Sequence, residues 1–491
     1  MRTISQKSIV TQAYIWLIAP VVLFVAFWIR PLVSVPVLAG IAWSIWRIYN
    51  PRIDGKRLRR DGFMDSEGFS SVTVDRKWWW IMGLAAFYVL QSGIGSLYYQ
   101  IPADHDWRNA VFYDLSRRSW PVTYGEGADL GILCYYIGFW LPSALVSKAT
   151  GLIVPGDIAQ LIYASWGVWI ALNFIISWCG GKAKWFILLI FVLFDYWELP
   201  IKFLLNPEEF AYVHGIWDKA LFWIEYSGYQ GLPPNRIMFS FTYNQGVPSW
   251  VGFMLLWHQR HNIKALLFNY ALLLLFAPFP WICIFPYVTV KLLQHFRKAI
   301  TVENVTGLFV GLCVGIYFLS NRSGGSIGWA DSDEPLYVVP IYGVAFTLMA
   351  YGVYLPFIWN KVKHNMLFWS MLVTAFFVPF VQFRENLDVG LRVAMPLTVF
   401  ISVALCRMLS EMPRGKNPVR RLFWCVFAIG AIMPAWQIVF AARGELNALL
   451  HHQPVKLIYY MGYLDDPTRN LDADNFVGRG ESLYTRWLMP R

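Results

Sequence analysis

Charged residues are scarce in this sequence. Only 14% of the 491 residues are Asp, Glu, Lys or Arg, whereas 57% are hydrophobic and 18% are aromatic. So few charges could not cover the surface of a water-soluble particle of this size, which excludes a soluble globular protein. The composition instead predicts an all-α polytopic membrane protein, a bundle of transmembrane helices.

Cysteine is also sparse, and its spacing excludes two further classes of protein. The six cysteines lie in or beside apolar runs and form no CxxC pair or metal-like spacing, so we expect neither a disulfide framework nor a zinc site. The first apolar run, 13–29, is not followed by a small-residue cleavage site. It therefore predicts a membrane anchor rather than a cleaved signal peptide.

The apolar runs predict about thirteen transmembrane spans. Four regions follow from them: an N-terminal helix pair with a basic cytoplasmic loop (1–77), a module with outer loops 100–129 and 200–248 (78–250), C-terminal transmembrane helices (251–441) and an outer tail (442–491). The expected spans are 13–29, 32–46, 78–99, 157–177, 185–199, 249–260, 265–279, 281–293, 304–320, 336–357, 366–382, 391–408 and 421–441.

The apolar run 130–146 decides the topology, and we predict that it does not cross the membrane. With this choice, the inner loops carry 24 of the 41 Lys and Arg residues but only 7 of the 30 acidic residues. That asymmetry matches the excess of positive charge found in cytoplasmic loops. The net charge of +11 is therefore explained by topology and does not indicate nucleic-acid binding.

The first outer loop holds the strongest candidate site. Asp104 and Asp106 lie two residues apart, Arg108 follows, and the apolar residues behind them recur at helical spacing, which predicts a short amphipathic surface helix starting just after the acids. A single aspartate at such a place is well explained as a helix cap. The pair of acids with the arginine indicates catalysis, and both interpretations stay open.

Later outer segments contribute further candidates. Asp195 interrupts the apolar stretch FVLFDYWELP, where a carboxylate costs roughly 2.5–3.5 kcal/mol at the bilayer centre and less near an interface, so it is either functional or reaches the interface. A second surface helix is predicted within 207–227. Five more polar residues are predicted at the outer rim: Tyr243, Asn244, Gln245, Arg384 and Arg392. They are suited to binding sugar hydroxyls or phosphate. Alternatively, they form a polar turn and local ion pairs.

The order of a first crossing, an outer loop with paired acids and the segment YYIGFWLPSALVSKATG resembles the GT-C membrane glycosyltransferases. The resemblance implies that Asp104 and Asp106 act on the acceptor or on a divalent cation such as Mg or Mn, with Asp104 as the metal ligand. It also implies a sugar donor carried on a polyprenyl phosphate. The sequence lacks the HPPLGK and WWDYG motifs of the protein-modifying members, so we expect a glycan or lipid acceptor.

These observations predict an integral membrane glycosyltransferase of the bacterial inner membrane, with its site facing the periplasm. Asp106 would act as the base on the acceptor, assisted by Asp104, and Arg108, Arg384 and Arg392 would bind the phosphate. Asp195, Tyr243, Asn244 and Gln245 complete the predicted substrate site. Two rival classes remain: an O-antigen polymerase or ligase, and a transporter or lipid flippase.

Overall fold

The computed structural model describes most of the chain. The described residues are 2–50, 68–100, 104–125, 130–197, 235–322, 327–329, 351–377, 381–383, 392–413, 415, 417–451 and 476–490. They are mostly helical. In chain order the helices are α1 (Gln6–Trp28), α2 (Pro31–Tyr49), α3 (Arg76–Gln91), α4 (Asp104–Arg117), α5 (Leu141–Thr150), α6 (Ile153–Trp178), α7 (Trp185–Leu193), α11 (Asn235–Ser240), α12 (Tyr243–His258), α13 (Leu266–Leu274), α14 (Pro278–Gln294), α15 (Phe296–Ala299), α16 (Val302–Phe318), α18 (Leu355–Val362), α19 (Met366–Phe377), α21 (Met395–Glu411), α22 (Pro418–Gly430) and α23 (Ile432–Leu450).

The described part of the chain contains fewer long helices than the thirteen predicted spans. Three of its helices, α1, α2 and α6, are long and apolar enough to cross a membrane. A fourth span is possible where α22 and α23 meet at an angle of 45°. The prediction for 185–199 was too long, because α7 ends at Leu193, and the predicted span 336–357 lies mostly outside the described residues.

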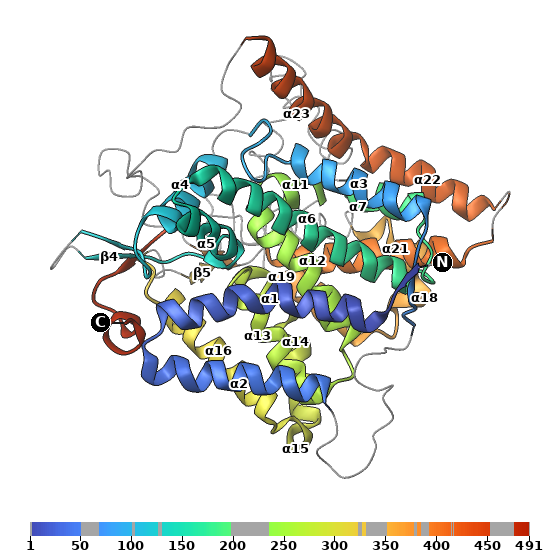
Figure 1. The fold of residues 1–491 in the computed structure, drawn as a ribbon. Coiled ribbons are helices and arrows are strands. Elements are labelled where there is room, and N and C mark those ends of the chain that lie inside the picture. Colours follow the sequence, from blue (N-terminus) through green and yellow to red (C-terminus); the bar gives the residue numbers. More distant parts are fainter. Residues whose placement is uncertain are drawn as a thin grey trace.

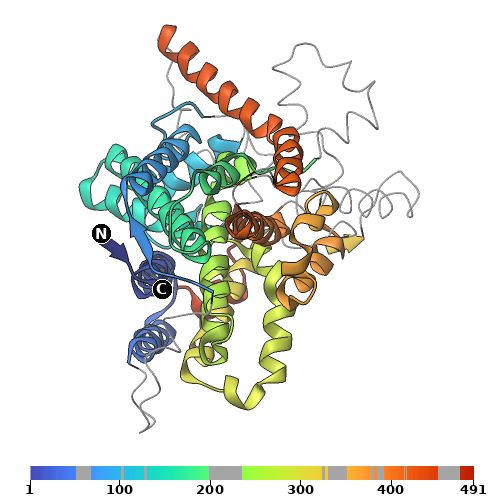
Figure 2. The same cartoon turned by 90° about the vertical axis from the view of Figure 1, so that its right-hand side faces the viewer.

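Short strands, which were not predicted, join segments that are distant in the sequence and define the two ends of the molecule. At one end, β1 (Arg2–Ile4) pairs antiparallel with β2 (Val72–Val74). At the other, β3 (Thr123–Tyr124), β4 (Gly131–Leu133) and β7 (Val477–Arg479) form a three-stranded sheet. We call these the β1–β2 end and the β4 end; α1 and α2 run between them in Figure 1 and are seen almost end-on in Figure 2. A third sheet pairs β5 (Ile327–Trp329) with β6 (Val381–Phe383).

Hydrogen bonds place the connecting loops at one end or the other. The backbone N–H of Thr73 donates to the carbonyl of Gly181 over 2.8 Å, so the loop between α6 and α7 lies at the β1–β2 end with the basic N-terminal loop. The Arg30 N–H donates to Leu488 over 2.7 Å, so the turn between α1 and α2 meets the C-terminal segment near the β4 end. This pairing agrees with the side on which the sequence placed each of these loops.

The segment 130–146 does not form a single helix and returns to the end from which it starts. It consists of strand β4, a 3-10 turn at Ile137–Phe139 and the beginning of α5. Beyond α5, the carbonyl of Gly151 accepts a 3.0 Å hydrogen bond from Arg117 of α4. Both flanks of the segment therefore adjoin the chain between Arg117 and Tyr124.

The long helices pack through aromatic contacts and close approaches at glycine. Trp16 of α1 stacks on Tyr163 of α6 with ring centroids 4.4 Å apart, and each side chain donates a hydrogen bond to the other residue's carbonyl, at 2.9 and 2.6 Å. A Cβ atom on Gly167 would lie 2.9 Å from the Trp16 ring, so this crossing requires a glycine.

The prediction of a surface helix after the first acids was wrong, and the predicted span 421–441 is bent. Helix α4 is no surface helix: His105, Val111 and Leu115 are fully buried, because α5 and α6 cover it. The predicted span 421–441 breaks at Ala431, and α23 continues to Leu450, into the region assigned to the outer tail. It projects from the bundle in Figures 1 and 2. The surface helix predicted within 207–227 lies outside the described residues.

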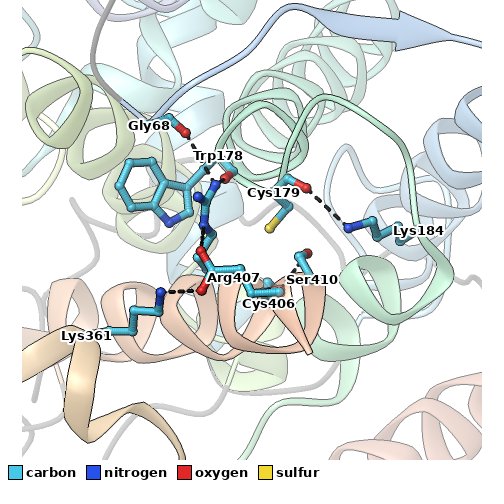
Figure 3. A network of polar contacts seen from close by, with 9 residues as sticks. Gly68, Trp178, Cys179, Lys184, Lys361, Cys406, Arg407 and Ser410 are labelled. Atoms are coloured by element: carbon cyan, nitrogen blue, oxygen red, sulfur yellow. Dashed lines mark hydrogen bonds and ion pairs between the residues drawn. The ribbon is translucent and has the colours of Figure 1, made fainter. Parts of the chain in front are cut away.

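A polar network holds the β1–β2 end together (Figure 3). Arg407 of α21 donates to the carbonyls of Trp178 and Gly68 and pairs with Glu411 at 2.5 Å. Glu411 also pairs with Lys361 of α18. The network joins α6, α18 and α21 and is separate from the site described next.

Candidate functional site

The two acids of the first outer loop lie in the first turn of α4. The helix begins at Asp104, three residues earlier than predicted, so both acids belong to it. Asp106 is partly exposed. Carboxylates in a first helical turn interact favourably with the positive end of the helix dipole, and a carboxylate is a side chain that can serve as a general base.

Arg108, one turn further along α4, contacts the start of α12. Its side chain is 4% exposed. The Nε atom donates to the Oδ1 atom of Asn244 over 3.4 Å, and the guanidinium lies 5.7 Å from the centre of the Tyr243 ring. The structure thus brings together three residues predicted for the site, 135 and 136 positions apart in the sequence. They do not form an exposed rim, because Tyr243, Asn244 and Gln245 are all buried in the first turn of α12.

Arg392 approaches the same place from the segment before α21. Its Nη1 atom donates a 2.7 Å hydrogen bond to the hydroxyl of Tyr136. The pKa of the neighbouring Tyr135 is raised well above its usual value by burial, and the positive charges of Arg108 and Arg392 oppose that rise. The positive charges of both predicted arginines therefore influence Tyr135, which lies in the segment that returns to the β4 end.

Arg236 of α11 is a third arginine near this place and, like Arg108, it is buried; it was not among the residues predicted for the site. It is 0% exposed; its Nη1 atom donates to the Ser92 hydroxyl over 3.2 Å and its Nη2 atom to the carbonyl of Gln91 over 3.3 Å. The guanidinium also lies 5.3 Å from the centre of the Tyr88 ring. No carboxylate among the described residues pairs with it, and burial lowers its pKa. Its sequence signal was weak: one basic residue in the segment PPNRIMFS.

His105 lies between two of these arginines and is neutral at physiological pH. Its Nε2 atom donates to the carbonyl of Ser240 over 2.8 Å, which places the ring proton on that nitrogen. Burial lowers the pKa of His105 to about 3, with a further contribution from Arg108 and a smaller one from Arg236. A neutral imidazole at this position avoids adding another positive charge to the group.

Unsatisfied polar atoms concentrate on α11 and the start of α12. Buried polar groups in native proteins are nearly always hydrogen-bonded to protein or water. Six buried side-chain atoms within 235–245 nevertheless have no partner among the described residues. They form an inner polar surface that a polar ligand, water or a segment outside the described residues would satisfy. The atoms are Oδ1 of Asn235, Nε of Arg236, Oγ of Ser240, Oγ1 of Thr242, Nδ2 of Asn244 and Oε1 of Gln245.

Asp195 occupies different surroundings. It is 5% exposed and follows α7; its Oδ1 atom accepts a 2.7 Å hydrogen bond from the Tyr196 N–H, and its carbonyl accepts one of 2.9 Å from the Tyr354 hydroxyl. The hydrogen bond from Tyr354 connects Asp195 to the start of α18. The hydroxyl of Tyr196 forms a hydrogen bond with Thr398 of α21. Arg384 lies outside the described residues.

A divalent cation would need several oxygen ligands. Within the described ranges, no group of three or more His, Cys, Asp and Glu side chains is close enough to hold a metal ion. The polar side chains that the site offers are its arginines, amides and carboxylates.

All six cysteines are free, and five of them are buried.

Comparisons with protein-family models, with curated proteins and with solved structures gave no match.

Proposed function

We propose that the protein is an integral membrane glycosyltransferase that moves a sugar from a polyprenyl-phosphate carrier to a glycan or lipid acceptor. The observation that carries the proposal is the group formed by Arg108, Arg236 and Arg392 beside the first turn of α4. The positive charges of Arg108 and Arg392 influence the pKa of Tyr135, and those of Arg108 and Arg236 influence the pKa of His105. Asp106 lies on the same helix as Arg108. Clustered arginines bind phosphate oxygens through paired N–H groups.

In the proposed reaction, Asp106 removes the proton from an acceptor hydroxyl. The acceptor oxygen forms the new bond to the anomeric carbon, while the bond from that carbon to the phosphate oxygen breaks. The arginines stabilise the negative charge that develops on the departing phosphate. The buried amides of Asn244 and Gln245 are suited to hydrogen-bonding sugar hydroxyls, since both have unsatisfied polar atoms. The site would face the periplasm of a bacterial inner membrane, at the β4 end.

The deciding experiment is a transfer assay with the purified protein in lipid nanodiscs. A panel of polyprenyl-phosphate sugars is offered with mixed glycan and lipid acceptors, and release of the free carrier phosphate is measured together with the product. We expect release with at least one donor and its loss in the Arg108→Gln variant. Absence of release across the panel, from protein with a cooperative thermal transition, would contradict the proposal.

A lipid or glycan flippase is a second candidate, and the full burial of Arg236 favours it. Charged side chains inside a helical bundle often mark the path of a charged substrate. The test is the movement of a fluorescent polyprenyl-phosphate sugar between leaflets of proteoliposomes, followed by dithionite quenching. Protein-dependent movement without cleavage of the sugar–phosphate bond would favour transport over transfer.

A further inference from the structure

A long groove opens on the side of the bundle, and one of its ends reaches Tyr88 and Gln91, the residues that Arg236 contacts. It has a cavity volume of about 780 Å³ and lies between α3, α7, α21, α22 and α23. Its walls are mainly apolar and partly open to the surroundings: Phe87 is 55% exposed and Leu189 41% exposed. In a membrane protein such a face meets the acyl chains of lipids, which are as apolar as the side chains themselves.

The groove is polarised along its length. Lys77 and Gln91 both line it, 14 residues apart on α3, a separation of about 21 Å at 1.5 Å per helical residue. The end near the β1–β2 sheet carries Lys77, Lys184 and Arg420. These residues lie at the starts of α3, α7 and α22, so three helix N-termini with their partial positive charges converge on the same end.

We propose that this groove binds an anionic phospholipid, with the phosphate at Lys77, Lys184 and Arg420 and an acyl chain along the apolar wall. Charge complementarity selects the headgroup. The groove is longer than the roughly 15 Å of hydrocarbon in one leaflet, so an acyl chain fits within it. The proposal does not depend on the glycosyltransferase assignment, because the basic residues of the groove lie at the starts of α3, α7 and α22, whereas Arg236 contacts the other end of α3 at Gln91.

The test uses a bimane fluorophore on Leu189→Cys in the full-length protein, with Cys425→Ala removing the only exposed native cysteine among the described residues. Nanodiscs of phosphatidylcholine receive increasing fractions of brominated phosphatidylglycerol, which quenches bimane on contact. A bound lipid gives quenching that saturates at a low mole fraction. Random contact with the surrounding bilayer gives quenching in proportion to the mole fraction.

The charge requirement is tested with two matched triple variants. Lys77→Gln/Lys184→Gln/Arg420→Gln removes the basic end of the groove and should raise the half-quenching fraction at least about tenfold. Arg76→Gln/Lys182→Gln/Arg421→Gln removes the same charge from adjacent residues that do not line the groove, and it should behave as the parent. In the parent protein, 1 M NaCl should abolish the saturation without any substitution in the groove.

Three outcomes would overturn the proposal: proportional quenching in the parent, an equal effect of the two triple variants, or saturation that persists in 1 M NaCl. A fourth is that unbrominated polyprenyl phosphate displaces the brominated lipid at a lower mole fraction than unbrominated phosphatidylglycerol does. That result would assign the groove to an isoprenoid carrier instead.

Discussion

Arg392 donates a 2.7 Å hydrogen bond to the hydroxyl of Tyr136, joining the segment before α21 to a chain segment 256 residues earlier. Tyr136 lies in the stretch that leaves the β4 end and returns to it. The bond therefore ties a predicted phosphate-binding residue to the segment 130–146, which does not form one continuous helix. The position of the Arg392 side chain therefore depends on the path of the segment that contains Tyr136.

Replacing Arg392 by Lys should lower kcat/KM for the donor by about 10- to 100-fold. The lysine keeps the charge but loses the planar fork that binds two phosphate oxygens at once, and a hydrogen bond to a charged group is worth about 1.5–3 kcal/mol. The measurement is steady-state transfer with the donor found in the panel. Arg479→Lys, at an exposed position of β7 near the β4 end, is the matched control and should leave the rate unchanged. Equal rates for the parent and Arg392→Lys would remove Arg392 from the site.

His105 should make the protein less stable as the pH falls below about 6.5. Its pKa is about 3 in the folded protein and near 6.5 in an unfolded chain. A lowered folded pKa contributes stability that is fully present above the unfolded pKa and is lost as the pH falls toward the folded pKa. Thermal midpoints measured in detergent from pH 7.5 to 4.5 should therefore decline more steeply for the parent than for His105→Gln.

The exposed His364 supplies the control. His364→Gln removes an imidazole from the surface instead of from the buried group and should keep the slope of the parent. Identical slopes for His105→Gln and the parent would show that the imidazole is not buried in its neutral form.

The sequence predicted the membrane class, the helical architecture and the return of the segment 130–146, because composition and loop charge respond directly to the bilayer. It did not predict the small sheets: β4 has three residues and pairs with β7 across more than 340 positions, a contact that no local pattern reveals. The length of α7 was overestimated for a similar reason. The apolar run that contains α7 continues beyond Leu193, but hydrophobicity does not distinguish a helix from buried irregular chain.

The candidate site was predicted in part. Arg108, Asn244 and Arg392 were singled out as polar residues in outer segments, and the structure brings them around Tyr135, Tyr136 and Tyr243. Arg236 was missed because the feature that distinguishes it is full burial without a carboxylate partner among the described residues. Burial depends on tertiary packing, which a local sequence pattern does not reveal. Asp195 was singled out because it interrupts an apolar run, yet its described contacts are with Tyr196 and Tyr354.

Labelling of introduced cysteines should place Lys182 and Glu481 on opposite sides of the membrane. Lys182 follows the loop bonded to β2, and Glu481 follows β7 at the opposite end. In a Cys425→Ala background, a membrane-impermeant maleimide added to intact cells should label Glu481→Cys, and Lys182→Cys only after permeabilisation. Gly181 is unsuited to this experiment, because a side chain there would approach the Ser71 carbonyl to 2.2 Å. Labelling of Lys182→Cys in intact cells would reverse the orientation and place the arginine group on the cytoplasmic side.

Asp106→Asn separates a catalytic carboxylate from a purely structural residue of the first helical turn. Asparagine keeps the size of the side chain but loses the interaction of its charge with the helix dipole, so loss of the structural role alone would cost about 0.3–1 kcal/mol. An amide cannot accept the acceptor's proton, and loss of general-base catalysis typically lowers a rate by ~10²–10⁴-fold. We therefore expect sugar transfer to fall by two to four orders of magnitude while the thermal midpoint stays close to that of the parent.

Asp75 provides the matched control for this substitution. Its carboxylate caps α3 at the β1–β2 end, accepting a 2.8 Å hydrogen bond from the N–H of Trp78. Asp75→Asn makes the same chemical change at a helix start far from the arginine group, so both its stability and its transfer rate should match those of the parent. Because a purely structural role predicts equal transfer rates for the two variants, transfer rates for Asp106→Asn as high as those for Asp75→Asn would identify Asp106 as a structural residue. The general base would then have to be sought at Asp104, which begins the same helix.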